Sequence, residues 1–211
     1  MNGPQTKETL ANEIWRACDI LRRDNNCGGI MEYLEHLSWL LFLRFLDAQE
    51  DEWEAQNQLA GRSYNRILDG ELRWKEWATK DWPADRLIEF VHGRLIPYLQ
   101  SLGGEPLRDT IRSVFAERNV IVCASGYNLK DVLEIINGID SHSQDIISTF
   151  AQVYEELLRR RGRKTRLAGE FSPPRPVVLF MVEFVAPKFG ETVYAPACGS
   201  CGFLAQSYLY M

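Results

Sequence analysis

The sequence predicts a mainly α protein, with an N-terminal helical bundle followed by a short, truncated α/β beginning. Apolar residues recur at helical spacing through most of the first 160 residues. The stretches between them are short and rich in Gly, Pro, Asn and Ser, which are typical of turns. Only one stretch, after residue 190, has the pattern of a strand that feeds a helix. We therefore expect one domain over residues 1–160, and a hinge with the incomplete start of a second over 161–211.

The first two elements are predicted to be helices. From Thr6 to Arg23, Leu10, Ile14 and Leu21 lie on one face, and "DNNCGG" then supplies residues that end a helix. A second helix is expected from Ile30 through "MEYLEHLSWLLFLRFLDAQEDEWEAQ", which is apolar nearly all round its middle. A helix that is apolar on every side must be surrounded, so we place it at the centre of the bundle.

The middle of the chain predicts shorter elements. Residues 59–83 contain tryptophans spaced too irregularly for one helical face, which indicates a loop or a small hairpin with short helical turns. Beyond it, helical spacing resumes in four stretches, separated by turn residues. These expected helices are 84–102, 107–118, 129–139 and 143–161.

The last fifty residues change in character. Pro173 and Pro174 restrict the backbone, and Pro176 suits the first turn of a helix "VVLFMVEFVA" that stops before Pro187. We expect a strand around Thr192 to Tyr194, then a glycine turn and a final helix. The exposed apolar surface of such a tail would either fold back on the helical domain or pair with a second copy.

Composition excludes several classes of function. The 211 residues are 45% hydrophobic and carry a net charge of -5, which argues against attraction to nucleic acid over the whole surface. The strongest apolar run, Trp39 to Leu46, contains Arg44 and is far shorter than the roughly 20 residues of a membrane span, so we expect no membrane contact. Five cysteines without a regular framework, and no apolar leader, favour the cytoplasm.

Other candidate sites are weaker. Cys198 and Cys201 form a C-x-x-C pattern, which could indicate zinc or redox chemistry. Zinc needs about four ligands and no second pair stands at a suitable spacing, so no metal site is expected. The scattered histidines, including His36 in the most apolar helix, fit core or surface positions better than catalysis. Ser125 lacks the G-x-S-x-G pattern of a hydrolase. The acidic stretch Asp47 to Glu54 is expected to be a solvated face rather than a partner site.

A strand that ends in a glycine turn and feeds a helix allows backbone amides to approach a ligand. The turn "ACGSCG" alone fits a tight turn without a ligand at least as well. The sequence around the turn favours a ligand-binding turn. "GEFSPPR" at 169–175, "APACGSCGFL" at 195–204 and the N-terminal "CDILRRDNNCGGIMEYLEHLSWLLFLRFLD" together resemble the methylation subunit of type I restriction-modification systems, over nearly the whole chain. That family consists of S-adenosylmethionine-dependent adenine-N6 DNA methyltransferases, so the resemblance implies a Rossmann-like methyltransferase beginning.

The resemblance also implies which residues lie beside the cofactor. The first motif contributes three positions, and the turn of the second would wrap the methionine part of S-adenosylmethionine. These implied cofactor-binding residues are Glu170, Phe171, Pro174, Pro196, Ala197, Cys198, Gly199, Ser200 and Gly202.

Several positions depart from the family pattern. Ser172 and Pro173 replace a tyrosine and a threonine, and Cys201 replaces a glycine. Ala195 replaces the aspartate that would accept the cofactor's ammonium, and losing such a charged hydrogen bond costs on the order of 1.5 to 3 kcal/mol. No Asn-Pro-Pro motif occurs, so the sequence predicts no catalytic residue. We expect this chain to bind no cofactor by itself and to be inactive alone.

A basic run stands out from the acidic chain. Such a cluster can neutralise DNA phosphates, and it fits a solvated helix end about equally well. The candidate DNA-binding residues are Arg159, Arg160, Arg161, Arg163, Lys164 and Arg166.

The resemblance implies DNA, a specificity subunit and a restriction subunit as partners, and a homodimer is a further candidate. In this interpretation the helical domain helps to clamp DNA and contacts the other subunits. The alternative is a stand-alone protein-interaction module with a degenerate cofactor motif, which the departures at Ser172, Pro173 and Ala195 favour.

Overall fold

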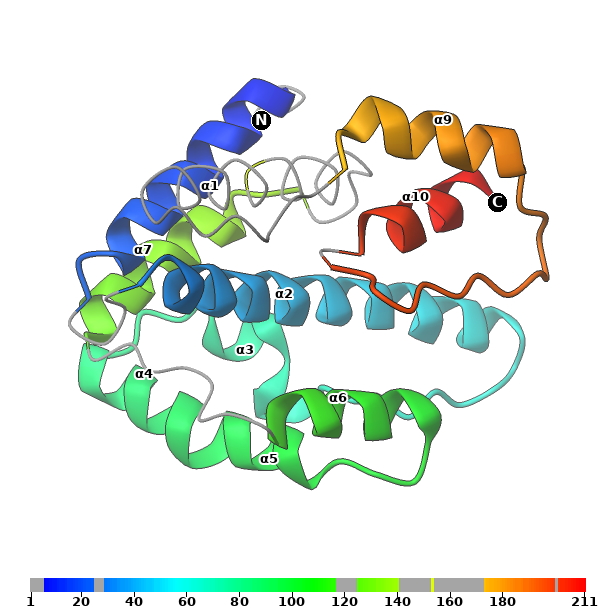
Figure 1. Cartoon of the computed structure of the whole chain (residues 1–211). Coiled ribbons are helices and arrows are strands. Elements are labelled where there is room, and N and C mark those ends of the chain that lie inside the picture. The colour runs from blue at the N-terminus through cyan, green and yellow to red at the C-terminus, as the bar shows by residue number, and fades with distance from the viewer. Residues whose placement is uncertain (1–5, 25–28, 117–124, 141–152, 154–172, 200) are drawn as a thin grey trace. The chain divides into compact units, whose positions relative to one another are not determined.

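A computed structural model describes residues 6–24, 29–116, 125–140, 153, 173–199 and 201–211, and every regular element in these ranges is a helix (Figure 1). The chain forms two compact units, Met1–Thr149 and Phe150–Met211. The described elements of the first unit are α1 (Lys7–Leu21), α2 (Ile30–Leu59), a 3-10 turn (Gly70–Leu72), α3 (Trp74–Trp77), α4 (Ala84–Phe90), a π-helical turn (Val91–Leu95), α5 (Ile96–Ser101), α6 (Pro106–Ala116) and α7 (Gly126–Asn137). Those of the second are α9 (Arg175–Val185) and α10 (Gly202–Tyr210).

The long helix α2 lies at the centre of the first unit and contacts α1, α3 and α7 (Figure 1). At its start the Gly29 N–H donates to Glu32 Oε2 at 2.5 Å. Its apolar middle is buried as the sequence predicted. The buried leucines of this stretch are Leu34, Leu37, Leu40, Leu41, Leu43 and Leu46.

Helices α1 and α7 pack against each other, although more than a hundred residues separate their starts. Thr6 caps α1 by accepting the Thr9 N–H at 3.3 Å. Asp24, buried just after α1, accepts hydrogen bonds from the Ser125 N–H at 3.0 Å and from Asn128 Nδ2 at 3.1 Å. Ser125 in turn caps α7, so one carboxylate links the end of the first helix to the start of the seventh.

Residues 60–83 form no hairpin, and the part of our expectation that allowed one is wrong. The segment carries the 3-10 turn and the short helix α3. The rings of Trp74 and Trp77 are buried with their centroids 5.0 Å apart, and Trp74 Nε1 donates to Asn137 Oδ1 at 2.7 Å. Both rings belong to the short helix α3, where Trp74 contacts α7 and Trp77 lies beside Phe90 of α4, with ring centroids 6.0 Å apart.

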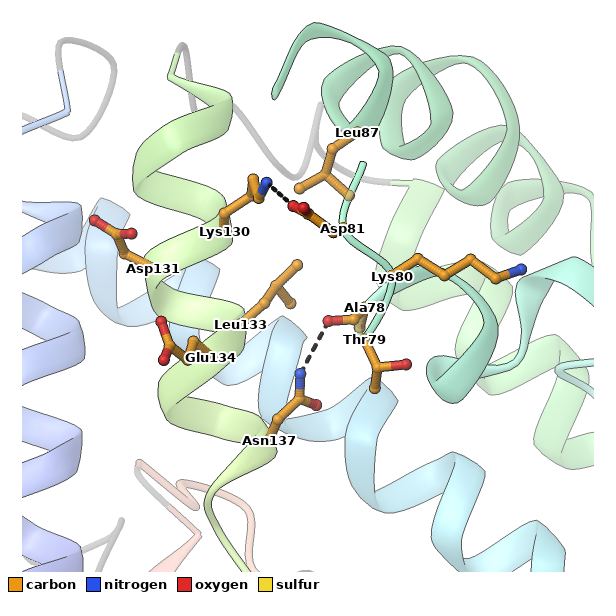
Figure 2. Close-up of a pocket in the computed structure, with 10 residues that line it drawn as sticks. All are labelled: Ala78, Thr79, Lys80, Asp81, Leu87, Lys130, Asp131, Leu133, Glu134 and Asn137. Carbon is orange, nitrogen blue, oxygen red and sulfur yellow. Dashed lines mark hydrogen bonds and ion pairs between the residues drawn. The ribbon is translucent and has the colours of Figure 1, made fainter. Parts of the chain in front are cut away.

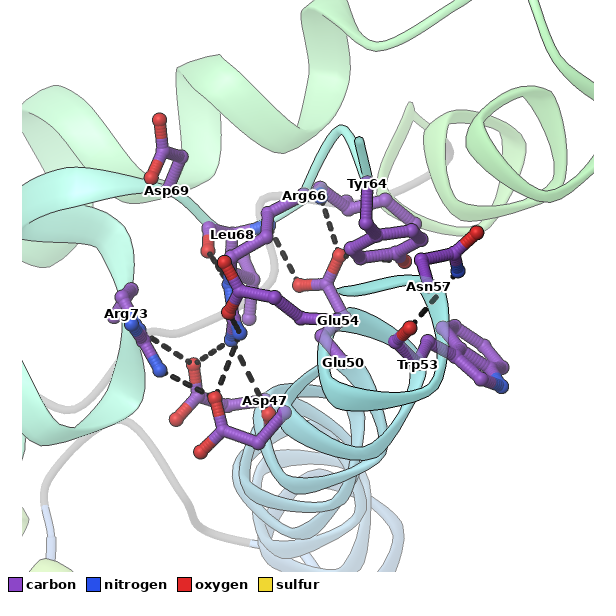
Figure 3. Close-up of polar contacts among 12 residues, drawn as sticks. Asp47, Glu50, Trp53, Glu54, Asn57, Tyr64, Arg66, Leu68, Asp69 and Arg73 are labelled. Carbon is purple, nitrogen blue, oxygen red and sulfur yellow. Dashed lines mark hydrogen bonds and ion pairs between the residues drawn. The ribbon is translucent and has the colours of Figure 1, made fainter. Parts of the chain in front are cut away.

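The acidic stretch at the end of α2 is not simply a solvated face (Figure 3). Asp47 and Glu50 are buried, and Glu50 accepts hydrogen bonds from the backbone N–H groups of Ile67 and Leu68, the latter at 2.9 Å. Arg66, also buried, lies 2.9 Å from Asp47 and 2.7 Å from Asp51. The expectation fails because half of this face is covered by the segment that follows α2.

The helix expected over 84–102 is divided by the π-helical turn. Pro97 has no N–H to donate to the carbonyl four residues earlier, at Gly93, and a widened turn just before the proline accommodates that loss. Two other predicted helices are present as α6 and α7, and α7 begins three residues earlier than expected because Ser125 caps it. The helix predicted over 143–161 lies outside the described residues.

Helices α9 and α10 of the second unit confirm two predictions, and Pro176 lies in the first turn of α9 as expected. The strand expected at Thr192 to Tyr194 is not formed. A strand needs a neighbour to satisfy its backbone groups, and the described residues contain no strand that could pair with this stretch. Val193 and Tyr194 are exposed.

Candidate cofactor turn

The candidate site follows helix α9, which Pro174 precedes as the N-cap residue. The helix ends at Val185 and is capped by Ala186, whose φ of 49° is left-handed and whose N–H donates to the Val182 carbonyl at 2.8 Å. Pro187 follows and cannot continue the helix. The chain thus reverses sharply before the segment that leads to the glycine turn.

Two residues of the turn have a left-handed backbone conformation. Gly199 has a φ of 53° and Cys201 a φ of 60°, and the Cys201 N–H donates to the Cys198 carbonyl at 2.8 Å. No atom lies within 4 Å of the place where a Gly199 side chain would begin, so this backbone is open to approach. Cys201 is the N-cap residue of α10 and offers its N-terminus no side-chain hydrogen bond.

Helix α10 holds the turn by packing against α9. Val178 and Val182 of α9 and Ser207 of α10 are buried in the second unit. Phe180 and Phe184 stack with their ring centroids 6.2 Å apart, yet both are exposed. The exposed side of α9 is therefore an apolar stripe made of Val177, Phe180, Met181, Phe184 and Val185.

The structure brings five predicted cofactor residues into one exposed segment that enters α10. Pro196, Ala197, Cys198 and Gly199 form the turn, and Gly202 is the first residue of α10. Pro174 stands separately at the start of α9. Glu170, Phe171 and Ser200 lie outside the described residues, as do the six basic residues from Arg159 to Arg166.

The two cysteines of the turn are free thiols on the surface. Partial burial, followed by the hydrogen bond to Cys198 and its charge, raises the pKa of the Cys201 thiol. Cys18, by contrast, is buried in the first unit, and burial raises its pKa to about 12. The turn therefore holds the accessible pair among the described cysteines.

A cavity of about 390 Å³ in the first unit lies between α7 and residues 78–81 (Figure 2). Lys130 Nζ lies 2.5 Å from Asp81 Oδ1 and 3.0 Å from the Trp82 carbonyl, and its hydrogen bond lowers the pKa of Asp81. Asn137 Nδ2 donates to the Ala78 carbonyl at 2.9 Å. These polar groups already hold the loop to the helix, so the cavity fits a structural joint better than a ligand site.

Metal clusters and membrane-spanning helices are both missing from the described ranges. No group of three or more His, Cys, Asp and Glu side chains is placed there to hold a metal ion. Nor does any helix in those ranges have the length and apolar character needed to cross a bilayer.

Two family models match the chain in succession. The model of the HsdM N-terminal domain matches residues 10–136, which contain α2 to α6 and most of α1 and α7. The chain belongs to the HsdM family. A second model, the N-6 DNA methylase, matches residues 144–211, which contain α9, the turn and α10.

Curated relatives of this HsdM chain are type I restriction enzyme methylase subunits. The EcoEI methylase subunit of Escherichia coli is 34% identical over 95% of this chain and 41% of its own length. The EcoKI methylase subunit of Escherichia coli K12 is 26% identical over 96% of this chain and 35% of its own length. The chain thus spans about two fifths of the length of these relatives.

Two solved structures resemble the HsdM chain closely. A chain from a study of complex assembly and conformational transition of the type I R-M system is 72% identical with a TM-score of 0.80, and the match covers 99% of our chain and 42% of that one. A modification subunit of a putative type I restriction enzyme from Vibrio vulnificus YJ016 is 34% identical, also with a TM-score of 0.80, and is matched over 47% of its length.

Proposed function

We propose that this chain supplies the helical domain and the cofactor turn of a type I modification enzyme, which transfers a methyl group from S-adenosylmethionine to adenine N6 in DNA. The observation that carries this proposal is the order of the two family matches: the HsdM N-terminal domain over 10–136, then the N-6 DNA methylase over 144–211. A stand-alone interaction module would give no reason for the second match.

The described turn fits the methionine part of the cofactor only partly. Its left-handed Gly199 and the uncapped start of α10 offer backbone amides to an acceptor, as ligand-binding βα turns do. Ala195 offers no carboxylate to the ammonium group. We therefore propose that the turn carries the cofactor contacts in the complete enzyme, and that this chain alone neither binds S-adenosylmethionine measurably nor methylates DNA.

The residues of this chain would have the following roles in the complete enzyme. Backbone amides around Gly199 and Gly202 would bind and orient the cofactor, and Glu170, Phe171 and Pro174 would line it from the other motif. The helical domain would contact DNA and the specificity and restriction subunits. The basic run from Arg159 to Arg166 would neutralise phosphates, because clustered guanidinium and ammonium groups bind DNA without reading its sequence.

The cofactor assignment is tested by restoring the missing carboxylate. Calorimetric titration of S-adenosylmethionine into the Ala195→Asp variant should show binding about ten- to a hundredfold tighter than for the unchanged chain. Ala195→Asn is the matched control, because it has nearly the same size without the charge. If Ala195→Asp is as silent as the unchanged chain at millimolar cofactor, the turn is not a cofactor site here.

The DNA assignment has a separate test. Replacing Arg160, Arg161, Arg163 and Lys164 with Ala should weaken binding to a duplex and flatten the dependence of affinity on salt, by up to about 0.9 in slope for each phosphate that is no longer neutralised. The control removes four exposed cations of the helical domain, through Arg16→Ala, Arg22→Ala, Arg62→Ala and Lys75→Ala. Equal salt dependence in the two variants would mean that net charge, not the basic run, governs binding.

A further inference from the structure

The turn between the two helices of the second unit brings the backbones of two cysteines close together. The Cys201 N–H donates to the Cys198 carbonyl at 2.8 Å, which is the hydrogen bond that closes a four-residue turn. Such turns hold their end Cα atoms less than about 7 Å apart. Disulfides form at Cα separations of about 4.4 to 6.8 Å, so this backbone needs little adjustment.

The two cysteines approach each other at the surface of the turn, and both are exposed and free. The Cys198 Sγ lies 3.9 Å from the Gly199 carbonyl oxygen within the same turn. The left-handed φ of Gly199 turns the chain back on itself and thereby allows this approach. In the family pattern that this turn resembles, glycine stands at the position of Cys201, so the pair comes with this chain's departure from the pattern.

We propose that Cys198 and Cys201 form a reversible intramolecular disulfide, which makes this turn a thiol-redox site. Its oxidant is a peroxide, and its reductant is a dithiol. Resting on the proposed function, the same bond would stiffen the segment that contacts the cofactor and so regulate it.

The chemistry balances with hydrogen peroxide. The Cys198 thiolate attacks one peroxide oxygen, the O–O bond breaks, and hydroxide leaves to become water; Cys198 is then a sulfenic acid. The Cys201 sulfur attacks that sulfur, the S–S bond forms, the S–O bond breaks, and a second water leaves. Two thiols are oxidised by two electrons in total, and one peroxide is reduced to two waters.

We assign the first attack to Cys198 and the second step to Cys201, which is partly buried. Partial burial and the neighbouring Cys198 raise the pKa of Cys201. Cys18 is buried in the first unit and is therefore not accessible to peroxide in the folded chain.

Peptide mass spectrometry of the full chain tests the proposal directly. The sequence contains no Lys or Arg after Lys188, so the tryptic peptide that begins at Phe189 carries both cysteines. After mild hydrogen peroxide and alkylation, that peptide should have lost about 2 Da and should carry no alkyl group, and dithiothreitol should restore two alkylation sites. Cys18→Ala is the control and should leave this result unchanged.

A second measurement distinguishes two thiols that the turn holds close together from two thiols that react independently. In a mixture of reduced and oxidised glutathione, the internal disulfide should exceed the mixed disulfide with glutathione by at least about tenfold, because the two thiols are held at high effective concentration. Cys201→Ser should carry glutathione or a sulfenic acid on Cys198 instead.

A parent peptide that remains doubly alkylated, or that gains only glutathione or further oxygens, would overturn the proposal. These outcomes do not depend on S-adenosylmethionine, so they can fail independently of the proposed function.

Discussion

Gly126, the first residue of α7, is the position where two backbones approach most closely. A side chain added there would begin 2.2 Å from the Ala84 carbonyl oxygen, which belongs to α4. Real contacts of this kind are never so short, so either helix would have to move. The absence of a side chain therefore sets how closely α4 and α7 pack.

Gly126→Ala should lower the free energy of unfolding by about 3 kcal/mol, because overpacking a close backbone contact forces a shift of both helices. Urea denaturation followed by circular dichroism measures this change. Gly93→Ala is the control, since nothing lies within 4 Å of its added side chain, and it should change stability by less than about 1 kcal/mol. A Gly126→Ala chain as stable as its parent would show that the two helices can separate freely.

His36 is a buried histidine on α2, which fits the sequence-based expectation of a core position. Burial lowers its pKa from the ordinary 6.5, and the charges of Glu35 and Asp24 oppose that shift only in part. The folded chain therefore prefers the neutral imidazole, whereas the unfolded chain takes up a proton near pH 6.5.

The sign of the pH effect follows from that preference. The contribution of His36 to stability is complete above about pH 6.5 and is lost as the pH falls from there toward the lower pKa of the folded state. His36→Gln should flatten the loss of stability between pH 7.5 and 5.5, measured by urea unfolding. An unchanged slope in His36→Gln would contradict the assignment.

At the scale of elements, Arg66 fastens the segment after α2 to the end of that helix (Figure 3). Besides Asp47 and Asp51, it lies 3.0 Å from Glu54, and its Nε donates to the Leu68 carbonyl at 3.0 Å. Its side chain is only 4% exposed, so removing it would leave the 3% exposed Asp47 carboxylate without this partner. The attachment of this segment to the end of α2 depends on a buried ion pair rather than on apolar packing alone.

Arg66→Met should lower the free energy of unfolding by about 3 kcal/mol, because it leaves the buried Asp47 carboxylate with only the more distant Arg73, whose Nε lies 3.8 Å away. The double variant Arg66→Met with Asp47→Leu should recover part of that loss, because it removes the stranded carboxylate as well. Arg62→Met, on an exposed side chain of the same segment, should be nearly neutral. Chemical denaturation of the four chains checks all three expectations, and equal stability of the two single methionine variants would rule out this role for Arg66.

The helices themselves were largely predictable, because periodic apolar residues and capping signals are local. The pattern of Leu34, Leu37 and Leu41 predicts a buried helix without any knowledge of what surrounds it. The partner of Arg66 was not predicted, although Asp47, Glu50, Asp51 and Glu54 follow the spacing of one helical face. That regular acidic face next to a loop arginine was the available signal. Sequence alone does not show which half of such a face a later segment covers.

At the scale of the whole molecule, the sequence predicted the order of a helical domain and a second, smaller region. The helical domain and the start of the methylase region match their families in that order. Contacts between distant residues were beyond prediction, such as Asp24 with Ser125 or Trp74 with Asn137, because they depend on how helices pack. The expected strand is missing because pairing, not propensity, makes a strand.

The candidate site was predictable only as far as its motif. Pattern resemblance identified the turn, and the structure shows where Gly199 and Cys201 adopt left-handed backbone. A single sequence predicts that glycine can adopt such a conformation, but it does not predict that a cysteine will. The contacts of each residue with a cofactor stay predictions, which the Ala195→Asp titration addresses.

The π-helical turn at Val91–Leu95 joins α4 to α5, and it contains one residue more than the corresponding turn of an α-helix. In a regular α-helix, deleting one residue rotates everything beyond it by about 100°. Here the loss of Gly93 would narrow the wide turn, so Leu87 before it and Leu99 after it would keep their buried sides, while Pro97 would lose the turn that accommodates its missing N–H. The length of these joined helices can therefore change by one residue here without rotating one buried face against the other, and the cost arises at the proline.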